Sequence, residues 1–174
     1  DLELGIFRSY ELPIAYWTTT RRLLMEEAER LPDWEPTLEA TREPEEKLFR
    51  KTEEIHQADA ITCPSDFVLE SIPAEIRTVK PCLVAPFGSP SMECPDIKRE
   101  IRAKTSPLRV LFVGSMSQRK GLADLFNAIR LLDTPQVELI VLGRPSLPMN
   151  FYRQQLQDFI HHPPAARHEV LELM

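Results

Sequence analysis

Two adjacent cations, Arg119 and Lys120, stand where a helix is expected to begin in VLFVGSMSQRKGLADLF, residues 110–126. The amino terminus of a helix already carries partial positive charge, so two further cations there cost free energy unless an anion binds nearby. The same turn offers Gly114 for a close backbone approach and the hydroxyl of Ser115. This combination predicts a small anion site that suits a diphosphate. A solvated pair at an exposed helix end is the alternative.

The turn GSMSQRKG departs from the common phosphate-binding motifs. A Walker A loop needs its second glycine where Arg119 stands and a hydroxyl residue where Gly121 stands, and no G-x-G-x-x-G fingerprint is present. A receiver-type signalling domain needs acidic residues at its strand ends to hold magnesium, and LFVGSMS and IVLGRPS have none. The predicted anion site therefore depends on the residues of this turn alone.

Histidine and cysteine residues do not indicate a metal site. His161, His162 and His168 lie in a stretch that we expect to be a proline-rich turn, without flanking acidic ligands. The three cysteines share no metal-ligand spacing and are expected to be reduced thiols of a cytosolic protein: Cys63, Cys82 and Cys94. We therefore expect no bound metal.

Apolar runs alternate with amphipathic stretches along the chain. The patterns predict a helix within 11–34 that stops at Pro32, and further helices over 44–58, 67–72, 119–132 and 149–160. They predict strands over 58–65, 80–90, 108–114 and 137–143. Strands that alternate with helices indicate parallel sheets, so the predicted class is α/β. Two strands in each half are too few for a stable doubly wound domain, and both sheets are expected to be incomplete.

A linker is predicted where the apolar pattern stops. Residues 88–107, GSPSMECPDIKREIRAKTSP, contain three prolines and no apolar periodicity. We place the domains at 1–88 and 108–174, joined by a linker at 89–107. The first residue is Asp and the last helical pattern, ARHEVLELM, breaks off, so we expect a piece of a longer protein.

Charge and hydropathy limit the partners. The formal net charge is -6, which argues against nucleic acid as a partner. No apolar run approaches the ~18 residues of a membrane span, so a cytoplasmic location is expected, and peripheral attachment to the membrane stays open.

Several stretches, in order, resemble one enzyme family. VLFVGSMSQRKGLADLFNAIRLL followed by VELIVLG resembles the start of the C-terminal domain of family-four glycosyltransferases, which have the GT-B fold. ADAITCPSDFVLESI and CLVAPFGSP resemble the last strands of the N-terminal domain in that family, and PPAARHEVLELM resembles the segment before its second nucleotide-contacting region.

The resemblance implies two Rossmann-like domains of GT-B type, both incomplete. Residues 1–88 correspond to the C-terminal half of the acceptor-side domain, and residues 108–174 to the N-terminal half of the nucleotide-sugar-binding domain. The implied activity is that of a hexosyltransferase, which moves a sugar from a nucleotide-sugar donor to an acceptor hydroxyl with retention. No metal or other cofactor is implied, and the acceptor, a sugar or a glycolipid, is not identified.

The resemblance also assigns site residues. Lys120 matches the family's lysine for the donor diphosphate, with Arg119, Gly114 and Ser115 around it. Many members carry an arginine where this chain has Ser115, so Arg119 is the expected second cation. The pair after the next strand, Gly143 and Arg144, corresponds to residues that contact the nucleotide base.

The resemblance places two functional parts of such an enzyme outside this piece: the acceptor-side histidine and the acidic E-x7-E region. We therefore expect no catalytic residue here and no turnover by this segment alone. A non-catalytic nucleotide-binding module and a protein-interaction module remain as alternatives. Incomplete sheets also predict self-association through exposed strand edges.

Overall fold

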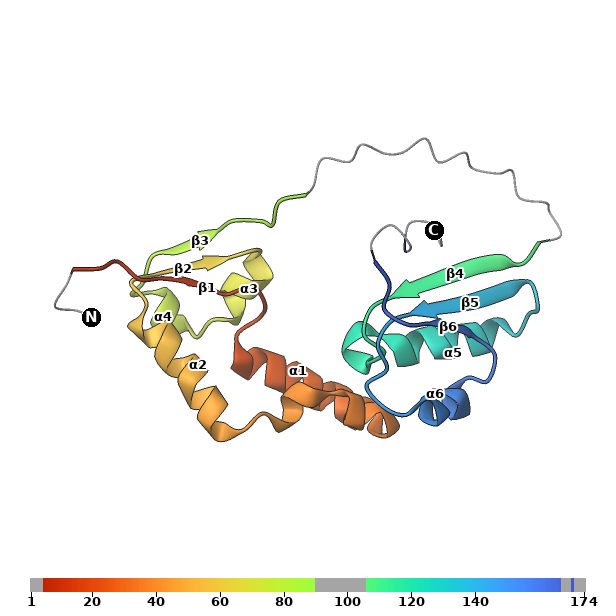
Figure 1. Ribbon diagram of the computed structural model, residues 1–174. Coiled ribbons are helices and arrows are strands. Elements are labelled where there is room, and N and C mark those ends of the chain that lie inside the picture. Colours follow the sequence, from red (N-terminus) through yellow and green to blue (C-terminus); the bar gives the residue numbers. More distant parts are fainter. Residues whose placement is uncertain (1–4, 90–105, 167–169, 171–174) are drawn as a thin grey trace. The chain divides into compact units, whose positions relative to one another are not determined.

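The computed structural model describes residues 5–89, 106–166 and 170. It is an α/β structure with two three-stranded sheets, and every strand pair is parallel (Figure 1). Contacts divide the chain into two compact units. Unit 1 consists of Asp1–Glu26 and Glu39–Cys94, and unit 2 of Glu27–Leu38 and Pro95–Met174. Both units have Rossmann-like character.

Unit 1 contains a sheet in the order β1-β2-β3. Its elements are β1 (Ser9–Glu11), most of α1 (Trp17–Arg30), the 3₁₀ helix η3 (Glu39–Arg42), α2 (Glu45–Gln57), β2 (Ala60–Cys63), α3 (Asp66–Ser71), α4 (Ala74–Arg77) and β3 (Cys82–Val84). Ile61 and Cys63 alternate along β2 and therefore face the same side, where Ile55 of α2 and Val68 of α3 join them in one core.

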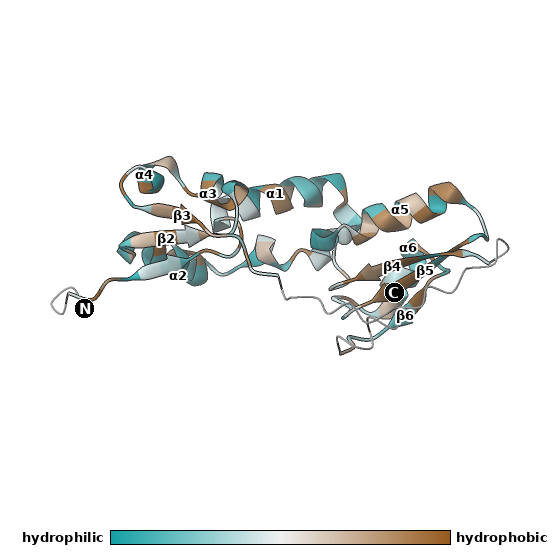
Figure 2. Ribbon diagram, turned by 90° about the horizontal axis from the view of Figure 1, so that it is seen from above, coloured by the Kyte–Doolittle hydropathy of each residue, from teal (hydrophilic) through white to brown (hydrophobic). Residues whose placement is uncertain are grey.

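Unit 2 contains a sheet in the order β4-β5-β6. Its elements are the 3₁₀ helix η2 (Pro32–Thr37), β4 (Leu108–Val113), the 3₁₀ turn η4 (Gln118–Lys120), α5 (Leu122–Leu132), β5 (Val137–Leu142), α6 (Met149–Gln155) and β6 (Ile160–His162). Much of β4, β5 and α5 is hydrophobic, as the brown colour in Figure 2 shows. Leu139 and Val141 of β5 pack against Phe126 of α5 and Tyr152 of α6, so both helices cover one face of the sheet.

A segment from the first third of the chain belongs to unit 2. Trp34 of η2 is 3 % exposed. Its ring centroid lies 5.7 Å from that of Phe126, 5.1 Å from that of Phe151 and 5.9 Å from that of Tyr152. Residues Glu27–Leu38 therefore complete the core of unit 2, although no pattern in the sequence indicates it.

The expectation of two strands in each half is wrong, because each sheet has three. Strand β1 was missed since its three residues, SYE, form no apolar run. The helix predicted at 149–160 is shorter in the structure: α6 ends at Gln155, and the backbone of Leu156 is extended. Strand β6 begins at Ile160, inside the range predicted as helix. Nη1 of Arg153 donates to the carbonyls of Gln157 and Phe159 and stabilises the turn that replaces the expected last turn of helix.

Other expected elements are confirmed. The helix expected at 67–72 forms as α3, and Ser65 caps it by accepting a hydrogen bond from Val68 N at 3.4 Å. The strands β2, β3, β4 and β5 and the helices α2 and α5 form within the predicted ranges. The central part of the predicted linker, residues 90–105, lies outside the described residues, as do Cys94 and most of the predicted last helix.

Candidate functional site

The loops after β4 and β5 meet at the carboxyl edge of the unit 2 sheet. Gly114 N donates to Leu142 O at 3.0 Å, and Met116 N donates to Arg144 O at 2.9 Å. A Cβ on Gly143 would lie 1.7 Å from Gly114 O, so only glycine permits this approach. The structure thus brings together the two glycines that the sequence analysis assigned to different contacts.

Lys120 lies beside Gly114. Its Cγ is 3.9 Å from the position that a Cβ on Gly114 would take, and the Phe112 ring is 3.8 Å from the same position. Gly114 also has φ +155°, a backbone conformation that residues with a Cβ rarely adopt. The absence of a side chain at Gly114 leaves the lysine stem next to bare backbone.

The Arg119–Lys120 pair is not part of α5, which begins at Leu122, so the expected helix start at Arg119 is wrong. Both residues lie in η4, and Gly121, at φ +74°, separates them from α5. Both side chains are exposed, and neither makes a hydrogen bond or an ion pair within the described part of the chain. The same is true of Arg144 after β5. Three cations of this edge therefore have no carboxylate partner among the described residues.

Ser115, the other residue predicted at the diphosphate, is exposed at the end of β4. Its Oγ lies 3.4 Å from Oγ of Ser117, and its carbonyl accepts from Ser117 N at 2.8 Å. The hydroxyl of Ser115 is thus held near the edge where Gly114 and Lys120 lie.

Gln118 anchors the turn that carries the two cations, and the sequence analysis missed it. Its side chain is buried, with 3 % of the residue exposed. Nε2 donates to Glu27 Oε1 at 2.5 Å and to Asp124 Oδ2 at 2.7 Å, while Oε1 accepts from Ala123 N at 2.8 Å. Its backbone N donates to Thr37 Oγ1 at 3.0 Å. No local signal marks this network, because two of its partners, Glu27 and Thr37, are distant in sequence.

Arg30 joins the two carboxylates of this network. It contacts Glu27 through Nε at 2.9 Å and Nη2 at 2.5 Å, and Asp124 through Nη1 at 2.9 Å and Nη2 at 2.8 Å. These hydrogen bonds hold the pKa of both carboxyl groups below their ordinary values, with Gln118 adding to the effect. The carboxylate of Asp124 therefore already accepts hydrogen bonds from Arg30 and Gln118.

The buried side chain of Tyr152 connects the loops after β4 and β5 through hydrogen bonds. Its hydroxyl donates to Met116 O at 2.5 Å and accepts from Ser146 N at 3.0 Å and Leu147 N at 3.2 Å. Burial raises the pKa of the phenol, so it stays protonated and keeps donating at neutral pH. A side chain of the unit 2 core thus fixes the two loops at the carboxyl edge of the sheet.

The third strand also reaches this edge. His161 Nε2 lies 3.0 Å from Gly143 O, and Gly143 N donates to His162 O at 3.0 Å. The expected turn at these histidines is wrong, because they form the end of β6; His168 lies outside the described residues. Within the described residues, no group of three His, Cys, Asp or Glu side chains could hold a metal ion.

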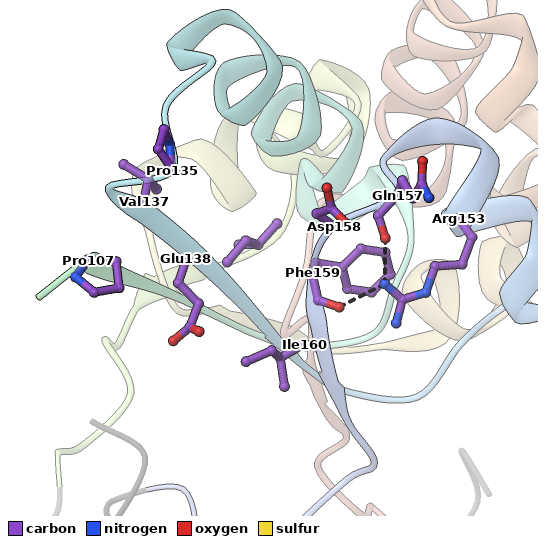
Figure 3. Close-up of a pocket in the computed structure, with 10 residues that line it drawn as sticks. Pro107, Pro135, Val137, Glu138, Arg153, Gln157, Asp158, Phe159 and Ile160 are labelled. Carbon is purple, nitrogen blue, oxygen red and sulfur yellow. Dashed lines mark hydrogen bonds between the residues drawn. The ribbon is translucent and has the colours of Figure 1, made fainter.

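A cavity of about 390 Å³ lies elsewhere, at the amino ends of β5 and β6 (Figure 3). Its lining residues are Pro107, Pro135, Val137, Glu138, Leu139, Arg153, Gln157, Asp158, Phe159 and Ile160. The Arg153 guanidinium lies 4.0 Å above the centre of the Phe159 ring and is tied to the neighbouring carbonyls. None of the predicted site residues lines this cavity, and ligands of parallel α/β sheets bind at the opposite, carboxyl edge.

Among the described residues, no helix is long and apolar enough to cross a membrane. No protein-family model and no curated protein matches the chain.

Proposed function

We propose that this chain is part of a retaining, metal-independent glycosyltransferase of GT-B type, and that the carboxyl edge of β4–β6 takes the diphosphate of the nucleotide-sugar donor. The observation that carries the proposal is the set of cations at this edge, Arg119, Lys120 and Arg144, without carboxylate partners among the described residues. The formal net charge of the chain is -6, so this local positive surface is a feature of the edge and not of the chain as a whole. An anionic ligand supplies the missing charge.

The fold supports the same assignment. In open parallel sheets, ligands bind beyond the carboxyl ends of the strands. Gly114, Gly143 and His162 mark the ends of three adjacent parallel strands, and the backbone at Gly114 is bare. Two small parallel sheets in one chain also fit the paired Rossmann-like domains of the GT-B fold.

Lys120 has the principal role in this proposal. When the sugar leaves, negative charge grows on the diphosphate, and an ammonium group held nearby stabilises the transition state more than the ground state. Arg119 supplies the second charge, since Ser115 stands where relatives of the resembled family carry arginine. Arg144 contacts the nucleotide.

The test is calorimetric titration of the chain with uridine, adenosine and guanosine diphosphates. We expect one of them to bind, and Lys120→Ala to weaken that binding by about tenfold or more, because hydrogen bonds between charged groups contribute roughly 1.5–3 kcal/mol.

The matched control is Arg109→Ala. Arg109 is also an exposed cation without a partner in the described residues, but it lies near the amino end of β4. Its removal should leave the affinity unchanged. Equal losses in the two variants would show that only general charge attraction is at work, and no binding by any of the three nucleotides would overturn the proposal.

A further inference from the structure

The side chain of Gln118 has no free hydrogen-bonding group. Both Nε2 hydrogens are donated to carboxylates, those of Glu27 and Asp124, and Oε1 accepts from the first turn of α5. A buried amide with every group paired is fixed in orientation, because each rotation leaves a donor or an acceptor unsatisfied. The Arg30 guanidinium lies against both carboxylates and offsets their repulsion.

The cationic turn depends on this anchor. Lys120 N donates to Ser117 O at 3.0 Å, and Gly121 N donates to Gln118 O at 2.9 Å, so Ser117 and Gln118 close the turn. Among the described residues, the side chains of Arg119 and Lys120 make no hydrogen bond of their own that could fix it. A shift of Gln118 therefore moves the backbone of both cations.

Two of the four groups that hold Gln118 come from a distant part of the chain. Glu27 precedes Gln118 by 91 residues, and Thr37, whose Oγ1 accepts from Gln118 N, precedes it by 81. The Thr37 hydroxyl is itself fixed, since it donates to Trp34 O at 2.7 Å. The buried indole of Trp34 in turn anchors this segment in the core.

We propose that Glu27 and Thr37 are positioning residues for the anion site, acting through Gln118 on the Arg119–Lys120 turn. The inference rests on the proposed function for the identity of the ligand, a diphosphate, but the positioning itself can be measured without a ligand. Residues Glu27–Leu38 are then a component of the donor site, although they touch no part of the ligand.

The first measurement is amide hydrogen exchange by NMR on the whole chain. In Glu27→Ala and in Thr37→Val, exchange at the amides of Lys120 and Gly121 should accelerate about fivefold or more, as local opening of the turn becomes easier. The amide of Leu156, which donates to Tyr152 O in the same unit, should not change. Unchanged exchange at Lys120 and Gly121, or equal acceleration at Leu156, would overturn the inference.

The second measurement is a double-mutant cycle with inorganic pyrophosphate as the probe. Glu27→Ala should weaken pyrophosphate binding about fivefold in the wild type and less than about twofold in Lys120→Ala, because the two residues act through one turn. Glu26→Ala is the control, since Glu26 lies next to Glu27 in α1 and pairs with Arg22. Equal effects in both backgrounds would contradict the positioning role.

The two measurements separate the failures. If the wild type binds no pyrophosphate, the proposed function fails, whereas the exchange rates still decide whether Glu27 and Thr37 hold the turn. Thr37→Val keeps the shape of the residue, so it tests the role even if Glu27→Ala unfolds unit 2.

Discussion

At the scale of single residues, the close approach of Gly114 and Gly143 determines the shape of the carboxyl edge where the candidate site lies. A Cβ on Gly143 would lie 1.7 Å from the Gly114 carbonyl oxygen and 2.7 Å from the carbonyl carbon. Backbone atoms on both sides cannot yield as a flexible side chain could. The two loops, and with them Lys120 and Arg144, can keep their separation only while residue 143 has no side chain.

We therefore expect Gly143→Ala to destabilise the protein by about 2 kcal/mol or more, because the loops must separate and the hydrogen bonds between them are lost. Urea denaturation followed by circular dichroism measures the change. Gly88→Ala is the matched control, since nothing lies within 4 Å of its Cβ position; it should change stability little. A Gly143→Ala variant as stable as Gly88→Ala would mean that the loops are not held this closely.

At the scale of elements, the end of α1 and the start of α5 are joined by ionic contacts. Arg30 belongs to α1 and Asp124 to α5, and their paired hydrogen bonds measure 2.8 and 2.9 Å. The fold lowers the pKa of Asp124 and of Glu27, with the hydrogen bonds from Arg30 as the main cause. Since a carboxyl with a lowered pKa stabilises the fold only while it is ionised, this junction depends on pH.

The stabilisation is complete above the ordinary pKa values of the two carboxyl groups, and it is lost as the pH falls through their lower values in the fold. We expect the urea midpoint of the wild type to fall more between about pH 5 and about pH 3 than that of Arg30→Gln.

Arg22→Gln is the control for this comparison, since its pair with Glu26 is more than half exposed on both sides and contributes little. It should follow the wild-type profile. Parallel profiles for the wild type and Arg30→Gln would show that the Arg30 contacts do not lower the pKa of the two carboxyl groups.

The elements differ in how well the sequence predicts them, and the reason is the range of the interactions. Strands β4 and β5 are continuous apolar runs and helix α5 has a helical apolar period, so local sequence was enough to predict all three. Strand β6 consists of Ile160–His162 and has no such pattern, since it forms only because β5 offers it a neighbour. The candidate site shows the same division: local sequence was enough to propose Arg119 and Lys120, whereas two partners of Gln118 lie 81 and 91 residues away.

At the scale of the whole molecule, strand edges set the expected behaviour in solution. In the described residues, each sheet has three strands, so β1, β3, β4 and β6 each have one edge without a neighbouring strand. On β4, Leu108 and Val113 are 57 % and 52 % exposed. An exposed apolar strand edge is a template for pairing with a second chain.

We expect sedimentation velocity to give a mass above the 20.1 kDa of one chain at micromolar concentration. The double substitution Leu108→Lys and Val113→Lys should shift the distribution toward the monomer, because charge on an edge strand opposes pairing. Leu131→Lys is the control, since Leu131 is 87 % exposed but lies on α5. A monomeric wild type, or an equal shift in the control, would contradict pairing through β4.

The packing of Trp34 in unit 2 has a consequence for how the chain is made. During synthesis, Glu27 leaves the ribosome 91 residues before its partner Gln118, which at ~5–20 residues per second is a delay of about 5–18 s. Trp34 must wait longer still for the aromatic side chains of α6. The chain has two tryptophans, Trp17 in unit 1 and Trp34 in unit 2. The fluorescence of each indole therefore reports on the folding of one unit. That of Trp34 reports on the last step in the folding of unit 2, in which the segment Glu27–Leu38 is buried long after its synthesis.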